Sequence, residues 1–209
     1  MARGRLWLEW GGLYLGLPLL IAVLLPPGSM FPALFAGTAL GVWLLHRTQG
    51  FHWRDLARGR IDRGAVAGFA AVTLAVALGV AMATTGDPLR FAVARPGFLV
   101  LVLIFYPVLS ALPQELVFRV LWFRRYAGIL PRGWPGIVLN AAVFSLAHLM
   151  YWSWVVAGMT FAGGLAFAWA YRRRGSFAMA VVMHGLAGQI VFALGLGVLF
   201  FAGNATRPF

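Results

Sequence analysis

Long apolar runs are the feature that most restricts the fold of this 209-residue sequence. Hydrophobic residues make up 62% of it and charged residues 11%, whereas a soluble domain is roughly half apolar and a quarter charged. Too little polar surface remains to keep such a chain dissolved in water, so lipid must surround most of it. The runs are apolar on every side, unlike the alternating strands of a membrane β-barrel. The sequence therefore predicts an all-α, polytopic transmembrane bundle.

The length of the chain limits the number of spans. A helical span needs about 20 apolar residues, which leaves room for roughly six to eight spans and little else. We predict about seven spans in a single integral membrane domain over residues 1–209. Their approximate ranges are 6–26, 29–46, 64–86, 97–113, 135–152, 153–171 and 176–202.

The distribution of arginine predicts the orientation. All 17 basic residues are arginine, and with seven spans 14 of them fall on or toward the side of the N-terminus. Only Arg90, Arg95 and Arg207 fall on the other side. Because arginine-rich loops stay in the cytoplasm, we expect a cytoplasmic N-terminus and a bacterial plasma membrane. The net charge of +12 then reflects topology, so membrane lipid, and not nucleic acid, is the expected partner.

A few ionisable side chains lie inside the predicted spans, where each is costly. With a helical rise of about 1.5 Å per residue, Glu115 and His184 lie roughly 15 Å deep and His148 roughly 20 Å deep. We therefore expect one carboxylate and two imidazoles to meet in the bundle interior. Glu115 and Arg119 are one helical turn apart and can form an ion pair. Pro113 can kink this helix and open a polar pocket beside the carboxylate.

This cluster has several open interpretations. A carboxylate can take a proton from water while imidazoles hold the water or a developing oxyanion. Glu115, His148 and His184 could instead ligate a divalent metal that lowers the pKa of a bound water. Either arrangement supports hydrolysis of a peptide bond, and the alternatives are a proton relay in a transporter or a structural polar network. The chain has no cysteine, which excludes thiolate metal sites and cysteine nucleophiles.

The residues of this cluster resemble the motifs of a known family. The segment QELVFR at 114–119 resembles E-E-x-x-F-R of the CAAX prenyl protease and bacteriocin-processing (CPBP, or Abi) intramembrane endopeptidases. Phe144 and His148 match the second family motif, F-x-x-x-H, and His184 matches the histidine of the third, H-x-x-x-N. The order and spacing agree, and the resemblance covers about residues 97–202.

The resemblance implies glutamate- and histidine-dependent proteolysis inside the membrane, on a membrane-associated peptide or protein substrate. In that family a glutamate activates water, and the histidines and asparagine stabilise the oxyanion. By this likeness Glu115 is the general base, and His148 and His184 bind the water or the oxyanion. Arg119 keeps Glu115 ionised and oriented, and Gln114 is a hydrogen-bonding neighbour in the site.

Two positions depart from the family pattern. Gln114 stands where the first glutamate is expected, and glutamine cannot take a proton. Gly188 stands where the asparagine is expected, followed by Gln189. Three explanations are open: Glu115 is the base of a variant subfamily, with Gln114 or Gln189 as the oxyanion donor; the protein is catalytically inactive and acts as a membrane binding or scaffold protein; or Gln114 is an engineered substitution. We favour the first, because two buried histidines are costly without a task.

Overall fold

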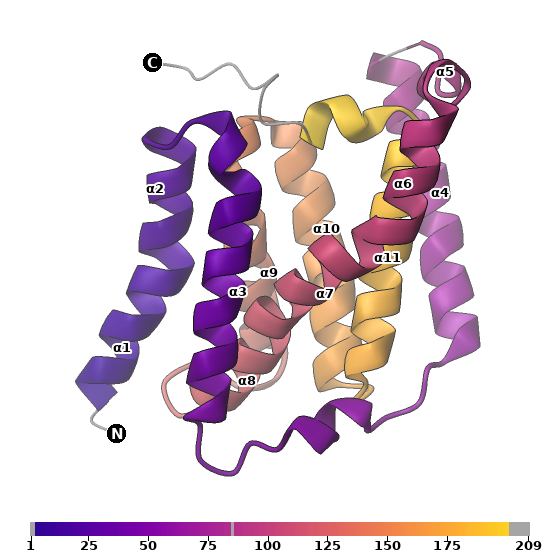
Figure 1. Cartoon of the computed structure of the whole chain (residues 1–209). Coiled ribbons are helices and arrows are strands. Elements are labelled where there is room, and N and C mark those ends of the chain that lie inside the picture. Colours follow the sequence, from indigo (N-terminus) through magenta and orange to yellow (C-terminus); the bar gives the residue numbers. More distant parts are fainter. Residues whose placement is uncertain (1–2, 85, 201–209) are drawn as a thin grey trace.

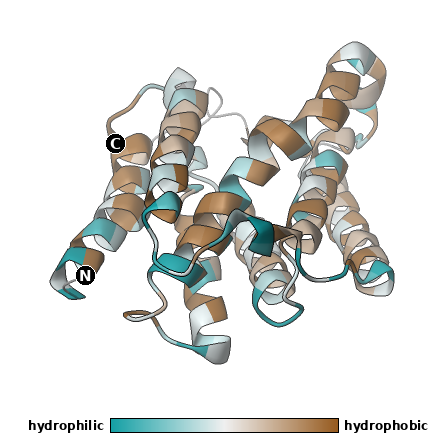
Figure 2. Ribbon diagram, turned by 60° about the horizontal axis from the view of Figure 1, so that its bottom comes forward, coloured by the Kyte–Doolittle hydropathy of each residue, from teal (hydrophilic) through white to brown (hydrophobic). Residues whose placement is uncertain are grey.

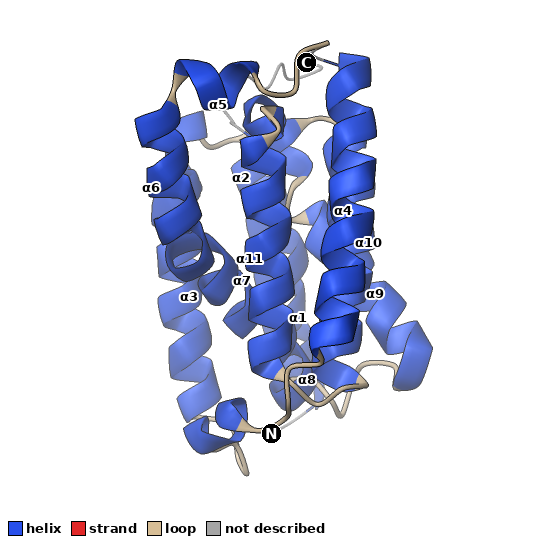
Figure 3. Ribbon diagram, turned by 90° about the vertical axis from the view of Figure 1, so that its right-hand side faces the viewer, coloured by secondary structure: helices blue, strands red, loops and turns tan. Residues whose placement is uncertain are grey.

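A computed structural model describes residues 3–84 and 86–200, and every regular element within them is a helix (Figures 1 and 3). A helix satisfies its own backbone hydrogen-bonding groups, as a lipid environment requires. The predicted all-α class is therefore confirmed. The α-helices are α1 (Arg3–Gly11), α2 (Leu17–Val23), α3 (Met30–His46), α4 (Arg63–Thr84), α5 (Arg90–Ala94), α6 (Pro96–Tyr106), α7 (Leu112–Glu115), α8 (Trp122–Arg125), α9 (Gly133–Leu146), α10 (Trp154–Arg172) and α11 (Phe177–Ala193).

Several of these helices join through π-helical turns. The turn η1 (Gly12–Gly16) joins α1 to α2, and η4 (Pro107–Ala111) and η5 (Leu116–Leu121) join α6, α7 and α8. Within the described residues, five helices are then long and apolar enough to cross a membrane, and the longest has 30 residues, Pro96–Arg125. Two further apolar helices, α3 and α11, have 17 residues each. The chain is an integral membrane protein, and its number of crossings stays a prediction.

The structure corrects two of the predicted boundaries. The run expected over 97–113 continues as a helix to Arg125. Pro107 lies in the π turn η4, and Pro113 lies in α7 between two such turns. A π turn re-routes the backbone hydrogen bonds that proline cannot donate, so the helix does not end there. The run expected over 176–202 is shorter, because α11 ends at Ala193 and a 3₁₀ helix, Leu196–Phe200, follows; residues 201 and 202 lie outside the described residues.

The arginine-bearing connections share one end of the bundle. The segments that follow α3, α8 and α10 lie at the same end as the start of α1, at the bottom of Figure 1. Figure 2 shows hydrophilic colours gathering in these connections, whereas the helices are largely hydrophobic. This arrangement agrees with the charge asymmetry that the sequence predicts. The assignment of this end to the cytoplasm stays a prediction.

The connection after α3 packs against the turn between α10 and α11. Gly59 has a φ of +83°, and a Cβ placed on it would lie 2.3 Å from the carbonyl oxygen of Gly175. Asp62 accepts a hydrogen bond from the Ala65 N–H (3.0 Å) and forms an ion pair with Arg174. The bond from the Ala65 N–H, together with the nearby Arg174 charge, lowers the pKa of the Asp62 carboxyl. These contacts tie the start of α4 to the start of α11.

Aromatic packing fixes the long bent helix against the first one. The Tyr14 and Trp122 rings meet edge to face, with centroids 4.9 Å apart, in a cluster of buried residues. The Tyr14 hydroxyl donates to the Val117 carbonyl at 2.7 Å, inside η5. Asn140 on α9 donates to the neighbouring Phe118 carbonyl, also at 2.7 Å. Two side chains thus satisfy carbonyl groups in this π turn, which holds the segment with Glu115 and Arg119 in place.

Candidate active site

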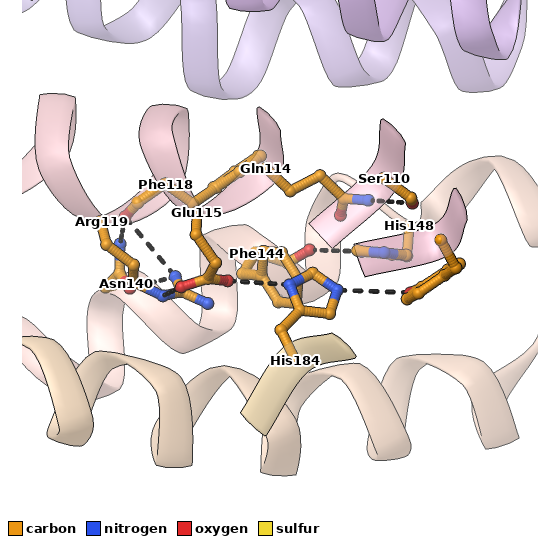
Figure 4. A network of polar contacts seen from close by, with 10 residues as sticks. Ser110, Gln114, Glu115, Phe118, Arg119, Asn140, Phe144, His148 and His184 are labelled. Atoms are coloured by element: carbon orange, nitrogen blue, oxygen red, sulfur yellow. Dashed lines mark hydrogen bonds and ion pairs between the residues drawn. The ribbon is translucent and has the colours of Figure 1, made fainter. Parts of the chain in front are cut away.

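The two π turns around α7 determine which way its polar side chains face. A π turn advances the chain by one extra residue and so changes the phase of the helix after it. Gln114 extends toward Ser110 and donates to its Oγ at 3.0 Å, whereas Glu115 points toward the opposite neighbours (Figure 4). These adjacent residues of one short helix therefore lie in different surroundings. Gln114 is partly exposed and lines a cavity, whereas Glu115 is fully buried.

Glu115 bridges two of the other predicted site residues. Its Oε1 lies 2.9 Å from His184 Nδ1, and its Oε2 lies 3.1 Å from Arg119 Nε (Figure 4). The ion pair predicted between Glu115 and Arg119 is present, and both side chains are completely shielded from solvent. The Arg119 guanidinium is the buried counter-ion of this carboxylate, which also accepts a hydrogen bond from His184 Nδ1.

Arg119 is itself held by groups on the neighbouring helices. Its Nη1 donates to Asn140 Oδ1 at 2.5 Å, and its guanidinium lies 4.6 Å from the centroid of the Phe144 ring. Guanidinium groups are attracted to the face of an aromatic ring, most strongly where water is excluded. Asn140 and Phe144 both lie on α9, one helical turn apart, so this helix supplies two of the groups that hold Arg119.

The two histidines gather around one phenylalanine. The Phe144 ring packs edge-on against both imidazoles, with centroid distances of 4.7 Å to His148 and 5.6 Å to His184. His148 lies within the candidate span Gly133–Tyr151, as predicted for 135–152, in the turn between the end of α9 at Leu146 and a 3₁₀ helix, Leu149–Tyr151. The carboxylate and the two imidazoles therefore come together as the sequence predicted, although only His184 touches Glu115 directly.

Hydrogen bonds define the proton positions on both rings. His148 Nδ1 lies 2.8 Å from the Phe144 carbonyl oxygen, which can only accept, so Nδ1 carries a hydrogen. His184 Nδ1 likewise donates to the Glu115 carboxylate. In the neutral form of each ring, Nε2 then keeps its lone pair. The Tyr106 hydroxyl lies 3.4 Å from His184 Nε2 and is the donor of that contact.

These Nε2 atoms belong to rings that line a cavity of about 420 Å³. Most of its wall is apolar and comes from α2, α3, α4, α10 and α11. The polar side chains in the wall are Thr73, Tyr106, Ser110, Gln114, His148, Tyr151, Thr160 and His184. A concave apolar site with a few convergent polar groups is typical of substrate pockets.

Three residues that contribute to this site were not assigned to it from the sequence. Ser110 precedes Gln114 by one helical turn, and that spacing is a signal that could have found it. Asn140 lies on a different helix from its partner Arg119, so no local spacing signals their contact. Tyr106 gives no sequence signal at all, because an aromatic residue in an apolar run is ordinary. Gln189 donates instead to the Leu103 carbonyl at 2.6 Å, outside the cavity wall.

The residues of the site do not fit a divalent metal. Within residues 3–84 and 86–200, no group of three His, Cys, Asp or Glu side chains is arranged to hold a metal ion. Both oxygens of Glu115 face Arg119 and His184 Nδ1, and His148 Nδ1 faces a carbonyl. We therefore derive no step that involves a metal.

A family model matches the part of the chain that supplies this site. The model of the type II CAAX prenyl endopeptidase Rce1-like family matches residues 96–201, just over half of the chain. The chain belongs to this family. The match contains all five predicted site residues, and it confirms the resemblance to CPBP proteases drawn from three short motifs. Neither curated proteins nor solved structures show a match to the chain.

Membership of the Rce1-like family identifies the class to which this protein belongs. The Rce1-like family is a family of membrane-embedded proteases, so this chain is a CAAX-protease-like member of the hydrolases. Its long helix Pro96–Arg125, with α9 and α11, lies within the matched residues. The part of the chain that supplies Tyr106, Gln114, Glu115, His148 and His184 is thus the part that defines the family.

Proposed function

We propose that this Rce1-like protein is an active intramembrane endopeptidase of a bacterial plasma membrane, acting on a membrane-associated peptide or protein. One observation carries the proposal: Glu115 Oε1 accepts from His184 Nδ1 at 2.9 Å, and the ring that it orients lines an apolar cavity. A carboxylate that fixes the tautomer of a histidine is the arrangement that makes an imidazole a general base in hydrolases.

In this proposal His184 removes the proton from water and Glu115 acts through His184. Glu115 is fully buried and is absent from the cavity wall, so a water in the cavity reaches His184 Nε2 before it reaches the carboxylate. When Nε2 takes the proton, the ring becomes a cation whose Nδ1–H still faces the Glu115 carboxylate. The negative charge stabilises that cation in surroundings with little water. Arg119 keeps Glu115 ionised and oriented.

His148 and Gln114 complete the site. A water molecule has two hydrogens, and the lone pairs on His184 Nε2 and His148 Nε2 accept them. The water oxygen bonds to the carbonyl carbon, and the carbonyl electrons move to its oxygen. Gln114 Nε2 has two hydrogens and uses one for Ser110, so the other can donate to this oxyanion. The oxyanion electrons then re-form the C=O bond as the C–N bond breaks, and the amine leaves with the proton from His184.

The residues that line the cavity also support a second function, that of a catalytically inactive protein that binds a membrane partner. Gln114 faces the cavity and cannot accept a proton, and the one carboxylate of the site is shielded from the cavity. An apolar cavity can bind apolar side chains of a membrane partner without any chemistry.

Cleavage of a membrane-tethered peptide library by the purified protein in liposomes tests the first function. We expect cleavage by the wild type, a loss on the order of 10⁴-fold in kcat for Glu115→Gln and at least about 100-fold for His148→Ala. Gln189→Ala is the matched control, because this side chain lies on α11 but bonds to a carbonyl outside the cavity. Circular dichroism of each variant verifies the fold.

The result separates the two functions. A wild type that is inactive, with cleavage gained by Gln114→Glu but not by Gln189→Glu, identifies an inactive member whose role is binding. Absence of cleavage in every form, including Gln114→Glu, refutes the protease assignment of this site.

A further inference from the structure

Tyr106 is the polar residue closest to the candidate general base on the cavity side. It ends α6, immediately before the π turn η4. Its hydroxyl lies 3.4 Å from His184 Nε2, and its ring packs edge-on against the His184 ring with centroids 6.1 Å apart. Because His184 Nδ1 donates to Glu115, Nε2 has no hydrogen in the neutral ring, and the tyrosine must donate.

Gly188 leaves the space that the Tyr106 ring occupies. It follows His184 by one turn of α11, on the same face of the helix. A Cβ placed on Gly188 would lie 2.0 Å from Tyr106 Cε1 and 2.2 Å from Cζ. Any side chain at 188 would therefore displace the ring. Glycine is unfavourable inside a helix, and the position of the Tyr106 ring is the physical reason for it here.

The hydrogen bond from Tyr106 to His184 is weak enough to be exchanged for another acceptor during the reaction. At 3.4 Å it is long for a hydrogen bond and therefore weak. The hydroxyl donates to the single lone pair of Nε2, so the water that donates its hydrogen to Nε2 must displace it. The displaced hydroxyl is then free to donate to the substrate carbonyl oxygen, on which negative charge develops when His184 takes the proton from water. A donor whose hydrogen bond strengthens as that charge develops contributes to kcat more than to substrate binding.

We propose that Tyr106 is a further catalytic residue, whose hydroxyl donates to the oxyanion, and that Gly188 makes room for it. This inference rests on the proposed function. In the step concerned, the water O–H proton moves to His184 Nε2 and the water oxygen bonds to the carbonyl carbon. The carbonyl π electrons move to oxygen, which accepts the Tyr106 O–H. The oxyanion electrons then re-form the C=O bond as the C–N electrons leave with nitrogen. The nitrogen takes the proton from His184, and Tyr106 turns back to Nε2.

Tyr106→Phe tests this role because it keeps the ring and removes only the hydroxyl. With a tethered peptide that the wild type cleaves, we expect kcat to fall about 100-fold, as for the loss of one oxyanion donor, while KM stays unchanged. Tyr171→Phe is the matched control. Its hydroxyl also makes a 3.4 Å hydrogen bond, from Arg124 Nε, but it lies outside the cavity wall, and its kcat should equal that of the wild type.

Gly188→Ala provides a second, independent perturbation. The added methyl group displaces the Tyr106 ring, so kcat should fall in the wild-type background and change far less in the Tyr106→Phe background, because both changes remove the same donor. This non-additivity is not expected of a merely structural tyrosine. It also keeps the test decisive if one single variant folds poorly.

The possible outcomes distinguish this inference from the proposed function. Wild-type cleavage with an unchanged kcat in Tyr106→Phe overturns the role of Tyr106 and leaves the protease function standing. A rise in KM with kcat unchanged also overturns it, because it assigns Tyr106 to substrate binding. Absence of wild-type cleavage overturns both.

Discussion

Replacing Glu115 by glutamine should destabilise the bundle as well as stop catalysis. The substitution keeps the shape of the side chain and removes its charge, so Arg119 becomes a buried cation without its counter-ion. Both side chains have no exposure to solvent, and their charged atoms lie 3.1 Å apart. Breaking a buried pair from one side costs about 3–5 kcal/mol. Because Arg119 keeps its hydrogen bond to Asn140 and its contact with the Phe144 ring, we expect the lower end, about 3 kcal/mol.

Unfolding of the protein in mixed detergent micelles by sodium dodecyl sulfate, followed by tryptophan fluorescence and circular dichroism, measures this free energy. Asp62→Asn is the matched control, because it neutralises one member of an ion pair whose side chains are 36% and 44% exposed. Exposed ion pairs contribute little to stability, because water screens the two charges. Replacing both members of the buried pair, as Glu115→Gln with Arg119→Met, should recover much of the lost stability, because no unpaired charge remains.

The comparison between these variants can refute the reasoning. If Glu115→Gln is no more destabilising than Asp62→Asn, the buried pair does not carry the energy assigned to it. If the double variant is less stable than Glu115→Gln alone, Arg119 stabilises the bundle through contacts other than the pair.

Three further predictions concern the frame around the site. Ser176→Ala, which removes a buried N-cap bond of 3.1 Å, should cost about 1 kcal/mol, and Ser153→Ala, whose cap bond is 3.4 Å, should cost less, in the same detergent titration. Gly59→Ala should lower the midpoint of thermal unfolding, because its Cβ would meet a backbone oxygen at 2.3 Å; Gly50→Ala, at a similar φ of +72° in open space, should lower it less. The pKa of Asp62 is lowered in the folded state. The ionised Asp62 carboxylate therefore stabilises the folded protein above its ordinary pKa of 3.8, and this stabilisation is lost as the pH falls through the lowered pKa of the folded state. In Asp62→Asn, the free energy of unfolding should consequently fall less steeply at acidic pH, which flattens the acid limb of a stability-against-pH curve. An acid limb identical to that of the wild type would contradict this assignment.

The helical bundle and the set of residues that form the site could be predicted, because both depend on local properties of the chain. Apolar runs of about 20 residues have no stable alternative to helices in lipid. The spacing of Glu115 and Arg119 makes them neighbours on any helix. The cost of burying His184 and His148 separately favoured their gathering with the carboxylate. The structure brings these residues together around Phe144 as expected.

The assignment of roles within the site could not be predicted in the same way. Sequence spacing gives Gln114 and Glu115 adjacent positions but no choice of which one faces the cavity. The π turns η4 and η5 make that choice, by changing the helical phase on either side of α7. Pro113 signalled a disturbance of the helix, but not that the helix would continue to Arg125.

By itself, then, the sequence determined a membrane-embedded helical protein, its family and a cluster of one carboxylate, one guanidinium and two imidazoles, because composition and motif spacing are properties of the chain alone. Only the tertiary structure decided that Glu115 reaches the cavity through His184, and that the Tyr106 ring fills the space above Gly188. Those relations join residues far apart in sequence, Tyr106 to Gly188 and Glu115 to His184. They depend on how the long bent helix packs against α11, which local pattern cannot specify.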